Sequence, residues 1–158
     1  MPADLKDSAP PKLGFRVPLD PARLRRARHR IRDYLHEHGA LPEATDAIVL
    51  AVEEAMTNAV RHSLSSHDLE IGLYFEGVDL VAEIRDRGRG FAIDGFDPAT
   101  IPDVQATGGR GLYLMAQLMD DLALRSDDGL EVRLVKRGVL GATTTSPGPR
   151  RRAARVLG

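Results

Sequence analysis

Two periodicities of apolar residues run along the chain, and each predicts a different kind of element. Apolar residues alternate with polar or small ones from Leu13 to Val17, which predicts a short first strand. Asp20 followed by Pro21 is typical of a helix start, because the carboxylate can accept a hydrogen bond from a free N–H group and proline suits the first turn. Apolar residues then recur at helical spacing until Gly39, which is typical of a helix end.

The longest helical pattern extends from about Pro42 to His62 and is apolar on more than one face. Such a pattern predicts a helix that is largely buried. The same helix nevertheless contains Glu54 and Asn58. Burying a carboxylate and an amide without partners costs several kcal/mol, so we expect a polar group to meet them.

Two hairpins follow the long helix. Alternating residues predict strands over 69–76 and 80–85, joined at Gly77, and a second pair over 122–124 and 130–134. Between the hairpins lie a loop and a short helix, whose buried stripe is Leu112, Met115, Ala116 and Met119.

The element order is therefore strand, helix, helix, strand, strand, loop, helix, strand, strand. This order predicts an α+β fold, a two-layer sandwich with a mixed, mainly antiparallel sheet and helices on one face. The other face of the sheet is then open to solvent or to a partner. We expect one domain over residues 12–138, between a flexible start (1–11) and a flexible basic tail (139–158).

The composition restricts the cellular location that we expect and the chemistry that the protein can perform. Among the 158 residues there is no cysteine, which excludes disulfides and cysteine chemistry and is compatible with a reducing cytoplasm. No apolar run approaches the roughly 20 residues that span a bilayer, so we expect a cytoplasmic protein without a membrane partner. The net charge is −1, although the tail carries Arg150, Arg151, Arg152 and Arg155. A basic tail can contact nucleic acid or acidic proteins, but a solvated end is the interpretation we favour.

The first candidate for chemistry is the pair formed by Glu54 and Asn58. Residues four apart lie on one face of a helix, so both side chains point to the same place, whereas Glu53 points elsewhere. A hydrated Mg²⁺ ion would suit this pair, since it prefers oxygen ligands and keeps waters. The alternative is a polar pair at a helix edge that is satisfied by the protein itself.

The second candidate is the segment Asp86-Arg-Gly88-Arg-Gly90 at the end of a strand. Asp86 has the parity of the apolar positions before it, which predicts that it projects toward the helices. There its carboxylate can accept a hydrogen bond from an exocyclic amine such as that of adenine. Gly88 and Gly90 allow a flat ligand to approach the backbone closely. The alternative is an ordinary glycine turn.

The third candidate is Gly108-Gly109-Arg110-Gly111-Leu112, which opens the short helix. A glycine-rich helix start offers free N–H groups and a positive dipole end to a phosphate, and Arg110 can add a charge. The alternative is a flexible loop end. The preceding loop, 92–107, has the length of a lid but also that of a passive connector. The sequence has no GxxxxGK[ST] motif, which excludes a P-loop.

Taken in order, these three motifs resemble the GHKL superfamily, whose ATP-binding fold is called the Bergerat fold. Glu54 to Asn58 is similar to its N-box, Asp86 to Gly90 to its G1 box, and Gly109 to Gly111 to its G2 box. The resemblance covers about residues 13–137. It implies that Asn58 holds Mg²⁺, that Asp86 reads adenine and that Glu54 is the general base. It further implies that Gly88 and Gly90 line the nucleotide and that Gly109 and Gly111 border the phosphates, with Arg110 and Leu112 in the same binding set.

Within the superfamily, the small single-domain layout resembles the bacterial anti-sigma-factor serine/threonine kinases. This implies ATP and Mg²⁺ as cofactors, phosphorylation of a hydroxyl on an anti-anti-sigma (STAS-type) partner, and control of a sigma factor. A different class of function is a switch module that binds nucleotide and a partner without turnover. The arginine-rich first helix suits a contact with an acidic partner in either class, or is simply solvated. The open sheet face is compatible with a homodimer, and we expect no nucleic-acid partner.

Overall fold

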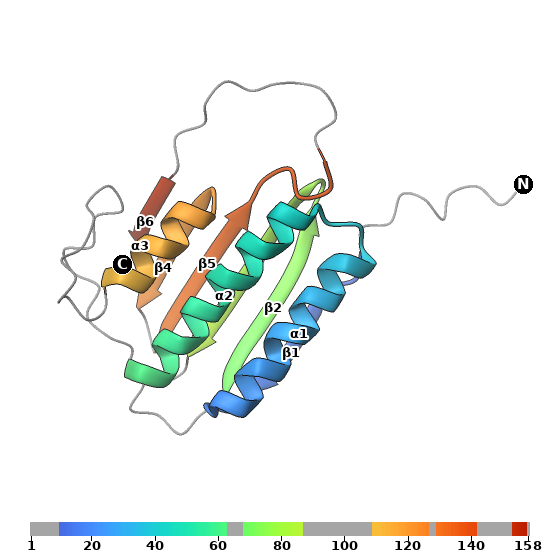
Figure 1. Ribbon diagram of the computed structural model, residues 1–158. Helices are drawn as coiled ribbons and strands as arrows, with labels where there is room; N and C mark the ends of the chain where they lie inside the picture. The colour runs from blue at the N-terminus through green and yellow to red at the C-terminus, as the bar shows by residue number, and fades with distance from the viewer. Residues whose placement is uncertain (1–9, 63–67, 87–108, 127–128, 142–152, 158) are drawn as a thin grey trace, which may run out of the picture.

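The computed structural model describes residues 10–62, 68–86, 109–126, 129–141 and 153–157, and for residues 62, 109, 110, 126 and 153–157 only the backbone. In this part of the chain, three helices lie on one face of a six-stranded sheet (Figure 1). The α+β sandwich with a mainly antiparallel sheet, as predicted, is confirmed.

The first two helices begin and end where the sequence predicted, and the third begins at the predicted glycines. Helix α1 (Pro21–Glu37) starts after Asp20, whose side chain accepts a hydrogen bond of 3.0 Å from the backbone N–H of Ala22. Gly39 follows the helix with a φ of 80°, a left-handed conformation that glycine adopts without steric cost. Helix α2 (Pro42–His62) crosses the sheet, and α3 (Gly109–Leu118) lies beside it.

The sheet has the strand order β1-β2-β3-β5-β4-β6. Strands β1 (Leu13–Val17), β2 (Leu69–Glu76), β3 (Asp79–Asp86), β5 (Leu130–Lys136) and β4 (Asp121–Ser126) pair antiparallel. The turn between β2 and β3 contains Gly77 with a φ of 60°. The register places Ile84 opposite both Ile71 and Val132, so that apolar residues of adjacent strands share the face under the helices.

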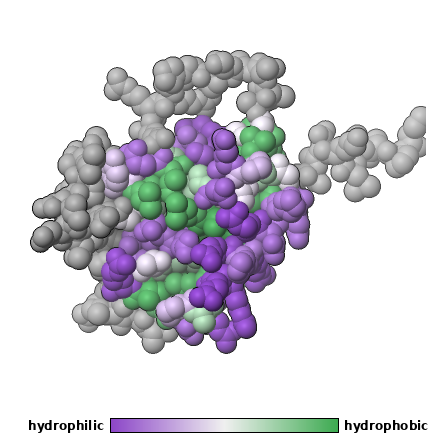
Figure 2. Space-filling view, viewed as in Figure 1, coloured by the Kyte–Doolittle hydropathy of each residue, from purple (hydrophilic) through white to green (hydrophobic). Residues whose placement is uncertain are grey.

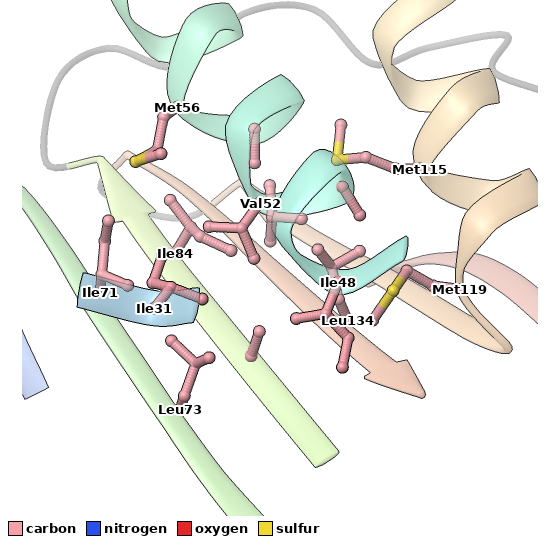
Figure 3. Packing of buried hydrophobic residues seen from close by; sticks show 14 of the residues in the cluster. Ile31, Ile48, Val52, Met56, Ile71, Leu73, Ile84, Met115, Met119 and Leu134 are labelled. Carbon is pink, nitrogen blue, oxygen red and sulfur yellow. The ribbon is translucent and has the colours of Figure 1, made fainter. Parts of the chain in front are cut away.

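The core fills the space between α2, α3 and this sheet face. Figure 3 shows Ile48 and Val52 of α2 pointing toward Ile84 and Leu134 of the sheet, with Met115 of α3 and Met119, which follows this helix, alongside. Six side chains of this layer are no more than 2% exposed: Ile48, Val52, Ile84, Met115, Met119 and Leu134. This close packing fixes the position of α2 above the sheet.

The opposite sheet face carries charged side chains and a hollow. Gly14 of β1 and Gly72 of β2 are paired, and the hollow of about 570 Å³ over them is also lined by Lys12, Glu83 and Arg85. Lys12 lies 3.6 Å from Glu83, to which Tyr74 also donates a hydrogen bond of 3.1 Å. No helix or strand of the described chain lies over this face. Its surface consists of the charged and polar side chains of the strands themselves.

The structure adds one strand that the sequence did not predict. Strand β6 (Ala153–Leu157) lies in the segment that was expected to be a flexible tail, and it pairs parallel with β4. Val139, just beyond the expected domain end, is fully buried and its carbonyl accepts a hydrogen bond of 2.8 Å from the N–H of Leu41. Among the described helices, none is long and apolar enough to cross a membrane.

Candidate functional site

The second half of α2 presents Glu54 and Asn58 one turn apart. Glu54 is half-buried, and Asn58 is only 4% exposed. Within the described residues, the amide nitrogen Nδ2 of Asn58 is buried without a hydrogen-bond partner. An unpaired buried amide is costly, because it has lost its water and gained nothing in return. This atom is therefore placed to donate to a group that the described part of the chain does not supply.

The first turn of α3 lies directly against Asn58. A Cβ atom built on Gly111 would come within 2.6 Å of Asn58 Nδ2 and 2.9 Å of Asn58 Oδ1. Real side chains essentially never approach so closely, so this position requires a glycine if Asn58 is to keep its place. Two segments far apart in the sequence thus meet at one point, where a buried amide faces the start of a helix.

Asp86 ends β3 on the helix-covered face, as its parity predicted. It is 5% exposed and pairs in register with Leu130 at the start of β5. Figure 1 shows the end of α2, the end of β3 and the start of α3 toward the same end of the molecule. The fold therefore gathers the segments that carry the three predicted motifs.

Several predicted site residues are not tested by this geometry. Gly88, Gly90 and the loop 92–107 lie outside the described residues. Gly109 and Arg110 form the start of α3, where only the backbone is described. Leu112 is buried, 3% exposed, and belongs to the hydrophobic core.

Glu53 lies on the other flank of α2 and faces α1. Its carboxylate accepts a hydrogen bond of 3.0 Å from Arg28, and both side chains are 37% exposed. This pair ties α1 to α2, next to Glu54 in sequence but on a different side of the helix. Sequence reasoning did not find Arg28, since the only available signal was one more arginine in an arginine-rich helix.

The contact between Asn58 and Gly111 could not be predicted from the sequence either. Each residue belongs to a predicted motif, but spacing along a helix says nothing about which residue of another helix it will touch. The only signal was the absence of a side chain at Gly111, which a close approach would require.

The comparisons with known proteins agree with this arrangement. The chain is similar to the serine-protein kinase RsbW of Bacillus velezensis, with 26% identity over 134 residues that cover 77% of this chain and 82% of the relative. It is 28% identical over 135 residues to RsbW of Listeria monocytogenes, covering 79% of this chain and 86% of the relative.

A solved structure shares the fold. The crystal structure of the RsbU and RsbW domains of Rv1364c from Mycobacterium tuberculosis matches with a TM-score of 0.63 and 20% sequence identity. The match covers 81% of this chain and 32% of that longer one. The family described as the histidine kinase-like ATPase domain matches residues 17–136, a span that includes all three motifs. The chain belongs to the histidine kinase-like ATPase domain family.

Proposed function

We propose that this protein binds Mg-ATP between α2, the end of β3 and the start of α3, and transfers the γ-phosphate to a serine or threonine of an anti-anti-sigma (STAS-type) protein. In this role it regulates a sigma factor in the cytoplasm. The observation that carries the proposal is the buried amide nitrogen of Asn58, which has no partner among the described residues and lies against the glycine start of α3. The similarity to proteins named serine-protein kinase RsbW supports the reaction class.

Asn58 and the start of α3 suit the phosphate end of the nucleotide. The amide N–H group of Asn58 can donate to a phosphate oxygen, and its Oδ1 atom can serve as one oxygen ligand of Mg²⁺. The described residues contain no group of three His, Asp or Glu side chains that could hold a metal ion. This fits an ion whose other ligands come from the phosphates and water, which is the usual arrangement for Mg²⁺.

The free N–H groups at the start of α3 would complete the phosphate contacts. Gly111 leaves the space in which Asn58 lies, and the positive end of the helix dipole favours an anion there. In this proposal Gly109 and Arg110 border the same phosphates.

Asp86 suits the base end of the nucleotide. A buried carboxylate on the helix-covered face can accept a hydrogen bond from the exocyclic amine of adenine. Gly88 and Gly90 follow it in the sequence and would let the base approach the backbone.

Glu54 is the proposed general base. It lies one turn before Asn58 on the same face of α2, and it forms no ion pair with any described residue. Mg²⁺ supplies charge neutralisation on the phosphates, and Glu54 orients or deprotonates the attacking hydroxyl. Positioning and charge stabilisation account for most of the rate in such transfers.

Calorimetric titration of Mg-ATP tests the binding site. We expect saturable binding to the wild type, and a loss of at least about tenfold in affinity for Asn58→Ala and for Asp86→Ala, since each removes a charged or polar contact. Glu53→Gln is the matched control, because this residue lies on the other flank of α2 and should leave the affinity unchanged. Equal affinity of all four proteins would contradict the proposed site.

Phosphate transfer to a STAS-type partner tests the catalytic assignment. We expect Glu54→Gln to keep Mg-ATP binding while the transfer of labelled phosphate falls by about 10²-fold or more, as for loss of a general base. If the wild type binds Mg-ATP and the partner but transfers no phosphate, the protein is the nucleotide-dependent switch module of the alternative interpretation.

A further inference from the structure

The arginines of α1 have different surroundings on the two flanks of the helix. On the flank toward α2, Arg28 contacts Glu53 at 3.0 Å and Arg32 contacts Asp46 at 2.8 Å. On the flank toward β1, Arg23, Arg26 and Arg30 form no ion pair with any residue in the described part of the chain. The spacing of these three arginines places them along one stripe of the helix.

A hollow of about 200 Å³ lies between this stripe and β1, and we name it the arginine groove. Its charged lining consists of Arg23, Arg26 and Arg30 of α1 and Arg16 of β1, without any acidic residue. Its apolar lining consists of Phe15, Val17, Pro18 and Ala27. The guanidinium of Arg30 lies 4.6 Å from the ring centroid of Phe15, which holds this charge over the apolar lining.

The arginine groove concentrates positive charge, and within the described residues only Arg16 of its four arginines has an acidic partner. Like charges three and four residues apart on a helix repel one another, so an anion in the groove relieves an unfavourable arrangement. Arg16 is close to Glu70 at 3.4 Å, but its side chain is 69% exposed, so its remaining donors are accessible. Figure 2 shows that the surface over α1 is largely hydrophilic.

The shape and the apolar lining favour a peptide over a nucleic acid. A volume of about 200 Å³ holds one or two side chains, whereas a nucleic-acid backbone needs an extended basic track. An apolar lining within a ring of guanidinium groups matches a segment in which carboxylates flank an apolar residue.

We propose that the arginine groove binds an acidic segment of a partner protein, with Asp or Glu side chains on its arginines and an apolar side chain against Phe15. This surface is separate from the residues proposed to bind ATP. Figure 1 shows the start of α1 and the end of α2 toward the same end of the molecule. A partner held in the groove is therefore anchored near the end that carries Asn58.

Fluorescence anisotropy with a labelled peptide tests the proposal. The probe is a short peptide in which a leucine is flanked by glutamates, and its counterpart has glutamines in their place. We expect Arg26→Gln/Arg30→Gln to weaken binding of the acidic peptide about tenfold or more, as for the loss of charge-assisted contacts. The control Arg25→Gln/Arg61→Gln removes the same net charge from exposed arginines outside the groove and should change binding less than about twofold.

Two further measurements define what would overturn the proposal. Equal weakening by both double variants would show nonspecific attraction of the peptide to exposed arginines, and no binding of the acidic peptide to the wild type would exclude the groove as its site. Tighter binding of a DNA oligomer that depends on Arg26 and Arg30 would assign the groove to nucleic acid. Mg-ATP titration of the same variants should give wild-type affinity, so this result separates a failure of the groove from a failure of the ATP site.

Discussion

The two halves of α2 differ in role although they belong to one continuous helix: the first packs in the core, and the second also carries the proposed binding residues. In the first half, Ile48 and Val52 are 0% exposed and pack between α3 and the sheet. In the second half, Asn58 is almost equally buried, but its amide nitrogen has no partner in the described chain. Burial of Ile48 and Val52 thus stabilises the protein, whereas burial of the Asn58 amide nitrogen costs free energy, as is usual where a binding site is built on a rigid element.

Buried polar groups show the same contrast. Tyr34 lies near the end of α1, beside Phe75 and His38, and its hydroxyl donates a hydrogen bond of 2.9 Å to the carbonyl of Pro11. Among the described residues, the amide nitrogen of Asn58 has no such partner. The described chain therefore satisfies a polar group where only stability is needed, and supplies no partner for one where we propose that a ligand binds.

The largest loss of stability should come from the first half of α2. We expect Ile48→Ala to lower the free energy of unfolding by about 2–5 kcal/mol, because it leaves a cavity among fully buried side chains. Urea denaturation measures this change. The control is Leu50→Ala on the same helix, where the side chain is 40% exposed and the cost should be below about 1 kcal/mol. Similar costs at both positions would contradict the contrast in packing.

Gly111→Ala should have the next largest effect, and it should affect stability and binding together. The new methyl group would collide with the Asn58 side chain, so we expect a loss of about 1–3 kcal/mol in stability and of Mg-ATP binding. Adding Asn58→Ala to this variant should restore the stability but not the binding. Gly14→Ala is the control, because a Cβ atom there meets nothing within 4 Å.

Tyr34→Phe should cost about 1 kcal/mol at neutral pH, the typical net value of one hydrogen bond. Burial raises the pKa of the Tyr34 hydroxyl, so the folded state favours the neutral form. This contribution is fully present below about pH 10, the ordinary tyrosine value, and is lost as the pH rises through the higher pKa of the folded state. Denaturation between neutral and alkaline pH should show a shallower loss for Tyr34→Phe than for the wild type.

Asn58→Ala should change stability least, by no more than about 1 kcal/mol in either direction. The variant loses packing but also removes an unpaired buried amide, and these effects oppose each other. The expected result is a protein of nearly wild-type stability that no longer binds Mg-ATP. A loss as large as that of Ile48→Ala would mean that Asn58 is a structural residue and would remove the contrast between the two halves of α2.

Much of the fold could be predicted because local signals agree with the tertiary structure. Asp20 and Gly39 mark the ends of α1, and the parity of Asp86 with the apolar residues of β3 predicted its burial. The candidate site followed from the same reasoning, since the position of Asn58 on α2 determines which way it points.

Other features depend on contacts that no local pattern encodes. The segment Ala153–Leu157 is short and follows a stretch rich in Thr, Pro, Gly and Arg, so only its pairing with β4 makes it a strand. The contact of Gly111 with Asn58 and the grouping of Arg16 with Arg23, Arg26 and Arg30 arise from the packing of separate elements.

The pairing of β4 with β6 also has a consequence for association between copies of the chain. Without β6, one edge of β4 stays unpaired, because β5 occupies only the other edge. An exposed strand edge is a template on which a second chain can pair. Pairing with β6 covers this edge of β4 and leaves the five-residue β6 as the outer strand in its place, so a chain shortened before Ala153 should associate with a second copy more readily than one that retains β6.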